Sequence, residues 1–269
     1  MKPKKYLGQH FLKNSAVLPL IIEAAELTKE DTVLEIGSGT GILTEELAKH
    51  AGEVLAVEKD FELVELLKKN VKAKNVKIVH QDALFFTPDI LGPYKVVANI
   101  PYNITSPLIR KFIESTPRPE LLVLMVQKEV AERITAKAGN RERGLLTIIV
   151  EFYATAEIIA QVPRTDFYPV PEVDSAIIKI RPKGDEAIRG LGGEPKQFFA
   201  VVKAGFSAKR QQIHNSLAAT MRLPKDQVRD ILKRSSIDPQ KRAEDLTLED
   251  WVNLTKTFES TIGKNEGEK

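Results

Sequence analysis

The stretch that decides the fold is Thr32-Val33-Leu34-Glu35-Ile36-Gly37-Ser38-Gly39-Thr40-Gly41. Its first half is an apolar run with β-branched side chains, which predicts a buried strand. Alternating glycines follow, and residues 42–49 continue with the spacing of an amphipathic helix. Glycine tolerates positive φ angles and lets a ligand approach the backbone closely. A strand, a glycine-rich turn and a helix in this order are typical of the opening of a nucleotide-binding α/β unit.

Strands and helices alternate beyond this unit. The strands we expect are at 54–57, 76–79, 95–98, 121–126, 145–153 and 176–180. The helices we expect in the same region are at 15–27, 61–72, from Thr105 onward and at 128–137. This alternation predicts an α/β protein, with a parallel-rich sheet covered by helices on both faces.

The composition changes after the last expected strand. The strand pattern disappears, and the helices that follow are expected at 196–220, 224–234 and 247–258. The parts we expect are an α/β domain at 1–183 beginning with a basic loop at 1–14, a linker at 184–195, a helical domain at 196–262 and a disordered tail at 263–269. The lone Trp251 is expected to pack in a core.

Several classes of function are excluded by what the chain lacks. It has no cysteine, which removes disulfides, thiolate catalysis and cysteine metal sites. Its histidines do not have the spacing of metal ligands, so no metal site is expected. No window approaches the roughly 20 apolar residues that span a membrane, and no apolar signal core follows the basic N-terminus. A cytoplasmic location is therefore the expectation.

Positive charge is concentrated in two places, although the net charge is only +3. Residues 1–13 carry lysines and no acid, and residues 203–242 carry far more basic than acidic side chains. Such patches suit a phosphate backbone, but a solvated helix face explains the charge alone about as well.

Acidic or amide side chains fall at the ends of successive expected strands. They are Glu35, Glu58, Asp82 and Asn99. Ligands of open α/β sheets bind at the carboxyl edge, where these residues would meet. Glu58 is placed to accept hydrogen bonds from ribose hydroxyls and Asp82 from an adenine amino group. Each residue alone could be a helix cap, but together they predict a site for an adenosine ligand.

The fourth strand leads into Asn99-Ile100-Pro101-Tyr102. The residue before a proline is extended and the proline lacks a backbone donor, so this turn presents acceptors and a ring face. It could hold an amino group on a flat ring. Alternatively, it could be a strand-ending turn with Tyr102 capping the core.

The spacing of the glycines separates the candidate ligands. A dinucleotide oxidoreductase would prefer Gly-x-Gly-x-x-Gly, and a phosphate-loop NTPase needs Lys-Ser/Thr after its glycines. Here Glu35 precedes Gly37-x-Gly39-x-Gly41 by two residues. This pattern resembles motif I of the S-adenosylmethionine-dependent methyltransferases.

Further motifs extend this resemblance over nearly the whole chain. They are Gly8-Gln9-His10-Phe11-Leu12, Asp82-Ala83, Asn99 to Ile104, Gln127-Lys128-Glu129-Val130, Phe167-x-Pro169-x-Pro171-x-Val173-Asp174-Ser175 and the block from Phe206 to Leu217. In this order they resemble the ribosomal RNA adenine N6,N6-dimethyltransferase family, and within it the small-subunit branch linked to kasugamycin resistance.

The resemblance implies a Rossmann-like class I S-adenosylmethionine-dependent methyltransferase with a small C-terminal helical domain. Its target would be two adjacent adenosines near the 3′ end of 16S rRNA, in a 30S assembly particle bound by a monomer. The cofactor-binding positions would be His10, Leu12, Glu35, Gly37, Gly39, Gly41, Glu58, Asp82, Ala83 and Asn99. The catalytic positions would be Asn99 and Pro101, which hold the amino group, with Tyr102 and Phe167 stacking on the adenine. Phosphate contacts would come from Lys4, Lys5, Lys209, Arg210 and Arg222.

Two other functions stay open. Large-subunit rRNA adenine methyltransferases of the macrolide-resistance type share the glycine loop and the Asn-Ile-Pro-Tyr type of motif. The stretch Arg143-Gly144-Leu145-Leu146, the Val173-Asp174-Ser175 ending and the block from Phe206 to Leu217 favour the small-subunit branch. A non-catalytic rRNA-binding assembly factor is the other, although the intact 99–102 motif argues against a loss of catalysis.

Overall fold

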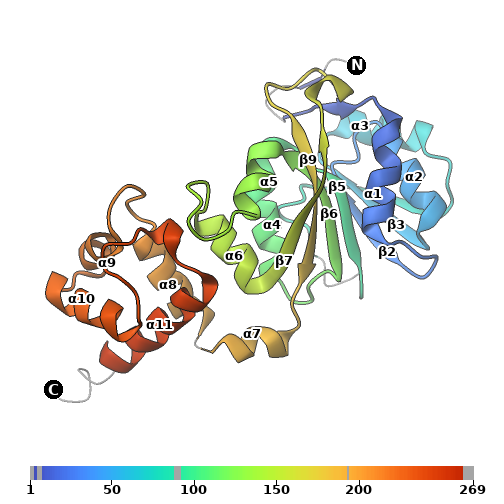
Figure 1. The fold of residues 1–269 in the computed structure, drawn as a ribbon. Helices are drawn as coiled ribbons and strands as arrows, with labels where there is room; N and C mark the ends of the chain where they lie inside the picture. The colour runs from blue at the N-terminus through green and yellow to red at the C-terminus, as the bar shows by residue number, and fades with distance from the viewer. Residues whose placement is uncertain (1–2, 5–7, 88–91, 193, 263–269) are drawn as a thin grey trace. The chain divides into compact units, whose positions relative to one another are not determined.

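The computed structural model describes residues 3–4, 8–87, 92–192 and 194–262 (Figure 1). The chain divides into two compact units, one formed by 1–132 with 154–182 and the other by 133–153 with 183–269. The expected tail at 263–269 lies outside the described residues. None of the helices in the described ranges is long and apolar enough to cross a bilayer.

The first unit is built on a sheet that has seven strands in the described residues, in the order β4-β3-β2-β5-β6-β9-β7. Its strands are β2 (Thr32–Ile36), β3 (Glu53–Glu58), β4 (Val76–His80), β5 (Lys95–Asn99), β6 (Leu121–Gln127), β7 (Ala154–Val162) and β9 (Ser175–Pro182). The first five strands are parallel to one another. The strand β9 pairs antiparallel with β6, and β7 pairs antiparallel with β9. The chain moves outward from β2 to β4 and then returns to place β5 on the other side of β2. This reversal creates a topological switch point between β2 and β5, where α/β proteins bind ligands.

Helices cover the two faces of this sheet (Figure 1). They are α1 (Leu18–Ala25), α2 (Ile42–His50), α3 (Phe61–Asn70), α4 (Thr105–Glu114) and α5 (Lys128–Ile134). On one face, α1 and α2 bury Ile21 and Leu47 against Val97 and Val123 in a continuous apolar core. On the other, α4 buries Leu108, Ile109, Phe112 and Ile113.

A short antiparallel ribbon pairs a segment near the start of the first unit with a segment near its end. The strand β1 (Phe11–Leu12) pairs with β8 (Phe167–Tyr168), with Phe11 opposite Tyr168 and Leu12 opposite Phe167. The loop that carries β8 begins after Val162 and ends at Ser175, and Ser175 also pairs with Gln127 at the carboxyl end of β6. The ribbon therefore lies at the carboxyl edge of the parallel strands.

The second unit is helical. Its helices are α6 (Leu145–Tyr153), α7 (Asp185–Leu191), α8 (Pro195–Gly205), α9 (Ile213–Met221), α10 (Lys225–Arg234) and α11 (Leu248–Ile262). Trp251 is fully buried, as expected, and a Cβ on Gly205 would overlap its ring. Glycine at this position therefore allows α8 to pack closely against α11.

Three expectations about secondary structure are wrong. Residues 145–153 form α6 rather than a strand, because this apolar run is buried within the helical unit against α8 and α11. The strand is supplied instead by β7, whose side chains are mostly exposed and whose pairing with β9 is interrupted by an irregularity near Ile158. The helix expected at 196–220 is split into α8 and α9, and the expected linker contains α7.

Candidate active site

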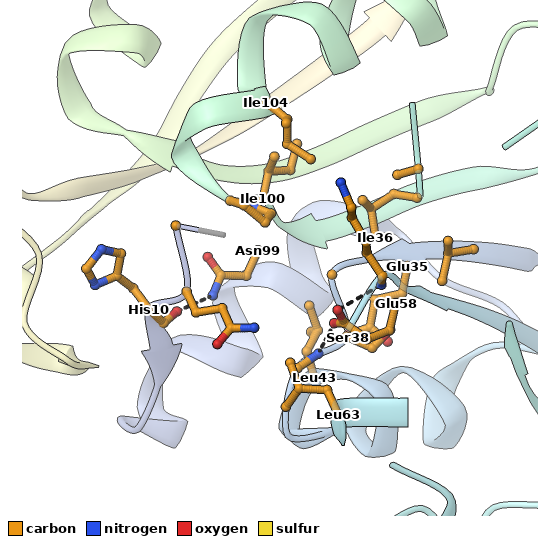
Figure 2. Close-up of a pocket in the computed structure, with 18 of the residues that line it drawn as sticks. His10, Glu35, Ile36, Ser38, Leu43, Glu58, Leu63, Asn99, Ile100 and Ile104 are labelled. Carbon is orange, nitrogen blue, oxygen red and sulfur yellow. Dashed lines mark hydrogen bonds between the residues drawn. The ribbon is translucent and has the colours of Figure 1, made fainter. Parts of the chain in front are cut away.

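A cavity of about 150 Å³ opens at the switch point between β2 and β5 (Figure 2). Most of its lining comes from five segments that are far apart in the sequence: 8–12, 35–40, 57–59, 81–84 and 99–104. The four strand-end residues Glu35, Glu58, Asp82 and Asn99 all line it, which confirms that these side chains meet at one site.

Glycines form the floor of the cavity where neighbouring residues approach closely. Gly37 has a φ of +70°, and a Cβ there would lie 3.2 Å from Cδ of Pro101. Gly39 has a φ of +57°, and a Cβ there would lie 3.3 Å from the ring of Phe11. Gly41 also has a positive φ, but it does not line the cavity and instead packs against Leu67 and Val71. Gly41 is the N-cap residue of α2.

Glu58 places a buried carboxylate at the end of β3. Its Oε2 accepts a hydrogen bond from the backbone N–H of Gly39 (3.0 Å), and its Oε1 accepts from the N–H groups of Lys59 (2.8 Å) and Asp60 (2.9 Å). Burial raises the pKa of this carboxyl, although the backbone donors oppose the rise. Glu58 is thus a fixed acceptor beside the glycine loop, suited to the two hydroxyls of a ribose.

Glu35 lies deeper than Glu58. It is 1% exposed, and its Oε2 accepts a hydrogen bond from Oγ1 of Thr44 at 2.6 Å. Burial raises the pKa of the Glu35 carboxyl to about 7. The side chain joins β2 to α2 beneath the glycine loop.

Asp82 and Ala83 form the wall on the side of β4. Asp82 Oδ2 lies 2.8 Å from the ammonium of Lys59, and its Oδ1 accepts from the N–H of Leu84 at 2.9 Å. The Lys59 ammonium holds the pKa of the Asp82 carboxyl below its usual range. An ionised acceptor at this wall suits an exocyclic amino group.

Asn99 ends β5 and faces the segment 8–12. Its Nδ2 donates a hydrogen bond to the backbone carbonyl of His10 at 3.3 Å (Figure 2). The His10 ring stacks on Tyr102 with centroids 5.5 Å apart, and its Nδ1 lies 2.7 Å from the carbonyl oxygen of Pro169. His10 therefore connects the 99–104 turn to the loop that follows β8.

The other members of the turn are held from within the same unit. The carbonyl of Pro101 accepts from the N–H of Ile104 (3.1 Å) and from Oγ1 of Thr105 (3.4 Å). The Tyr102 hydroxyl lies 2.7 Å from Oγ of Ser175. Ser175 thus fixes the ring of Tyr102.

The structure does not place Phe167 where the expected stacking on the target adenine would need it. Its ring is 0% exposed, does not line the cavity and packs in the apolar core with Leu12 and Ile177. Strand alternation turns the next residue, Tyr168, to the opposite face, where it is 62% exposed. Phe167 is therefore a core residue here and not a face of the base pocket.

The basic residues that are expected to contact RNA lie in different environments. Lys4 is expected to contact RNA, but its ammonium pairs with Asp60 (2.8 Å) and Glu62 (3.1 Å). These ion pairs fix the start of the chain to the N-terminus of α3. Lys5 lies outside the described residues. In the second unit, Lys209, Arg210 and Arg222 are expected to contact phosphate, and the structure leaves all three exposed.

Phe11 is a site residue that sequence reasoning missed. It lines the cavity, and its ring lies directly over Gly39. The signal was available in the neighbouring Leu12, because two adjacent residues of a strand point to opposite faces. One of them enters the core while the other covers the glycine loop.

The residues present fit S-adenosylmethionine. A Cβ on Gly37 would press on Pro101 and a Cβ on Gly39 on Phe11, so both positions of the loop that lines the cavity require glycine. Two carboxylates lie on the adjacent walls, where a nucleoside offers hydroxyl and amino donors. In the described residues, no group of three or more histidines or carboxylates could hold a metal ion.

The fold and this cavity define the class I S-adenosylmethionine-dependent methyltransferases. More narrowly, the chain belongs to the ribosomal RNA adenine dimethylase family, whose model matches residues 1–260. It is an rRNA adenine dimethyltransferase that uses S-adenosylmethionine.

Individual relatives agree with this assignment. The chain is 45% identical to a ribosomal RNA small subunit methyltransferase A of Dehalococcoides mccartyi, over 96% of this chain and 89% of the relative. A protein of the same name from Nostoc is 40% identical, covering 94% of this chain and 97% of the relative. Among solved structures, a dimethyladenosine transferase from Plasmodium falciparum has a TM-score of 0.80 at 30% identity, over 93% of this chain and 98% of that one. The 23S rRNA methyltransferase ErmE has a TM-score of 0.71 at 29% identity, over 92% and 98%.

Proposed function

We propose that this protein dimethylates N6 of two adjacent adenosines near the 3′ end of small-subunit rRNA. The observation that carries the proposal is the position of Asn99, at the end of β5 and on the wall of the cofactor cavity. The relatives from Dehalococcoides mccartyi and Nostoc, both named as small-subunit methyltransferases, support the choice of rRNA.

The cofactor is held by groups on three strands. Glu58 accepts from the ribose hydroxyls, Asp82 accepts from the adenine amino group, and Gly37 and Gly39 admit the ligand to the backbone. The ring of Phe11 covers the glycine loop from above. Bound S-adenosylmethionine supplies an electrophilic methyl group on a sulfonium sulfur.

The target adenine presents a weak nucleophile, because the N6 lone pair is delocalised into the ring. Oδ1 of Asn99 and the carbonyl of Pro101 accept the two N6 hydrogens and turn the lone pair toward the methyl carbon. At Pro101 the substrate hydrogen replaces the 3.4 Å hydrogen bond from Oγ1 of Thr105. The N6–carbon bond then forms as the carbon–sulfur bond breaks, and N6 releases a proton to water. Such positioning contributes up to about 7–11 kcal/mol to a reaction between two bound groups.

The aromatic contact to the base comes from Tyr102. One face of its ring is covered by His10 and its hydroxyl is held by Ser175, so the base stacks on the opposite face. Stacking contributes about 1–3 kcal/mol per base, which offsets part of the cost of unstacking the target. After the first transfer N6 retains one hydrogen, and one of the two acceptors is then sufficient to orient it for the second.

The substrate is rRNA within a 30S assembly particle, bound by a monomer in the cytoplasm, and the reaction contributes to small-subunit biogenesis. Lys209, Arg210 and Arg222 of the helical unit contact phosphates, since exposed basic side chains suit a nucleic-acid backbone.

Incubation with labelled S-adenosylmethionine tests this function. Unmethylated 30S particles and, separately, 50S particles would be the substrates, followed by mapping of the modified nucleotides. The proposal predicts label only in 30S particles, as dimethyladenosine at two adjacent positions near the 3′ end. Label in large-subunit rRNA would indicate the macrolide-resistance activity instead, and no transfer to either particle would indicate a non-catalytic binding factor.

A further inference from the structure

A lysine outside the cavity holds the turn that forms one of its walls. The ammonium of Lys111, on α4, donates hydrogen bonds to the carbonyls of Ala83 (2.9 Å) and Leu84 (2.8 Å) and to that of Phe86. These carbonyls belong to the turn 82–86, of which residues 82–84 line the cavity. Lys111 itself does not line the cavity.

The internal hydrogen bonds of this turn converge on its first residue. The carbonyl of Asp82 accepts from the N–H groups of Phe85 (2.9 Å) and Phe86 (3.1 Å), and the Asp82 side chain accepts from Leu84. Lys111 binds the carbonyls of Ala83, Leu84 and Phe86, and the carbonyl of Phe85 accepts from Nε2 of Gln81 at 3.3 Å. A single ammonium therefore collects acceptors that the turn does not satisfy internally.

This lysine uses its full donor capacity inside the fold. An ammonium has three hydrogens, and the three carbonyls match that number. The side chain is partly buried, and burial lowers the pKa of Lys111 while the charge of Asp82 opposes the fall. Lys111 is thus built into the protein and is not a surface charge aimed at RNA.

The helix that carries Lys111 also carries the other wall. Residues 99–104 line the cavity, and α4 begins at Thr105 immediately after them. The helix α4 therefore follows the segment 99–104 directly at its N-terminus. Further along, it holds the turn 82–86 through the hydrogen bonds of Lys111.

We propose that Lys111 is a positioning residue for cofactor binding, acting through the turn 82–86. The inference rests on the proposed contact of Asp82 and Ala83 with the cofactor adenine. This role gives a reason for the charged side chain of Lys111 at a position outside the ligand cavity. It also predicts that cofactor affinity depends on a side chain that does not touch the cofactor.

The absence of cysteine permits a specific test. In Lys111→Cys the new thiol is unique, and alkylation with 2-bromoethylamine displaces bromide to form a thioether with a terminal ammonium at the length of lysine. The matched control is Arg110→Cys, treated identically, because Arg110 is the adjacent residue of α4 and pairs with Glu114 at the surface. Calorimetry measures S-adenosylmethionine binding before and after alkylation, and thermal unfolding is recorded for each protein.

We expect the dissociation constant of Lys111→Cys to rise by about tenfold to a hundredfold, as when a charge-assisted hydrogen bond is removed, and to recover after alkylation. With saturating cofactor, kcat should change far less than KM. Arg110→Cys should bind as the wild type does in both forms. Wild-type affinity in Lys111→Cys, or a weakening that alkylation does not reverse in a folded protein, would overturn the proposal.

A second variant covers the case in which Lys111→Cys does not fold. Lys111→Arg retains charge and length, but a planar guanidinium cannot place one nitrogen against three carbonyls. It should fold and still bind S-adenosylmethionine more weakly; wild-type affinity would contradict the inference. Because binding is measured without RNA, these outcomes are independent of whether small-subunit rRNA is the substrate.

Discussion

The amide nitrogen of Asn99 donates a hydrogen bond to the backbone carbonyl of His10 at 3.3 Å. This contact sets the direction of the Asn99 side chain, because Nδ2 is bound to the segment 8–12 and Oδ1 is the end that can accept from a substrate. The same segment stacks its His10 ring on Tyr102. The N-terminal segment therefore orients both groups that we assign to the target base.

The Glu58 carboxylate should dominate the recognition of the cofactor ribose. Glu58→Ala removes an acceptor that is buried and fixed by three backbone donors. We expect S-adenosylmethionine to bind about tenfold to a hundredfold more weakly, measured by calorimetry. Glu65→Ala, on the exposed face of α3, is the matched control and should bind normally. Unchanged affinity of Glu58→Ala for S-adenosylmethionine would contradict the proposed contact of Glu58 with the ribose.

The burial of Phe167 predicts an effect on stability. Phe167→Ala leaves a cavity in the core and should lower the free energy of unfolding by about 3–5 kcal/mol, measured by chemical denaturation. Tyr168→Ala, at the exposed neighbour, should change it by no more than about 0.5 kcal/mol. A Phe167→Ala protein as stable as the wild type, but unable to methylate, would restore the base-stacking role expected from the sequence.

The buried Glu35 should make stability depend on pH. Its pKa is raised from 4.5 to about 7, so between these values the folded state holds a proton that the unfolded state has released. Folding stability from this group is therefore fully present below pH 4.5 and falls as pH rises toward 7, by roughly 3 kcal/mol at most. Denaturation of the wild type and Glu35→Gln at about pH 5 and pH 8, on either side of that pKa, measures the difference. Equal pH dependence in the two proteins would contradict a raised pKa.

The exposed turn between α8 and α9 should contribute to RNA affinity. Reversing the charges of Lys209 and Arg210 to Glu should weaken rRNA binding and reduce the slope of log affinity against log salt by about 0.9 for each phosphate that is no longer neutralised. Lys68→Glu with Lys69→Glu on α3 changes the net charge equally and controls for long-range electrostatics. If both pairs reduce affinity and slope alike, the turn has no specific role.

The sequence was sufficient for the site where chemistry restricts residue type. Glu35, Glu58, Asp82 and Asn99 each follow a strong strand signal, and parallel strands bring their carboxyl ends to one edge. It failed where tertiary packing decides. The run 145–153 is apolar almost throughout and has no period that separates a buried helix from a buried strand. The side chain of Phe167 could not be placed either, because its motif does not show which face of the β1–β8 ribbon turns inward.

Other parts depend on contacts between distant residues. Lys4 looks like a nucleic-acid contact in a basic stretch, but the fold brings Asp60 and Glu62 within reach of its ammonium. Lys111 carries no signal in the sequence, since an isolated lysine on an amphipathic helix is ordinarily a solvated charge. Only the packing of α4 beside the turn 82–86 shows what it binds.

The Asn99 side-chain oxygen is the group that we assign to hold the target amino group. The most direct test is the single-turnover rate of methyl transfer by Asn99→Ala to unmethylated 30S particles, with S-adenosylmethionine affinity measured on the same protein. We expect a rate lower by roughly a hundredfold to a thousandfold, with cofactor binding retained to within about tenfold. Transfer by Asn99→Ala at a rate close to that of the wild type would contradict this assignment.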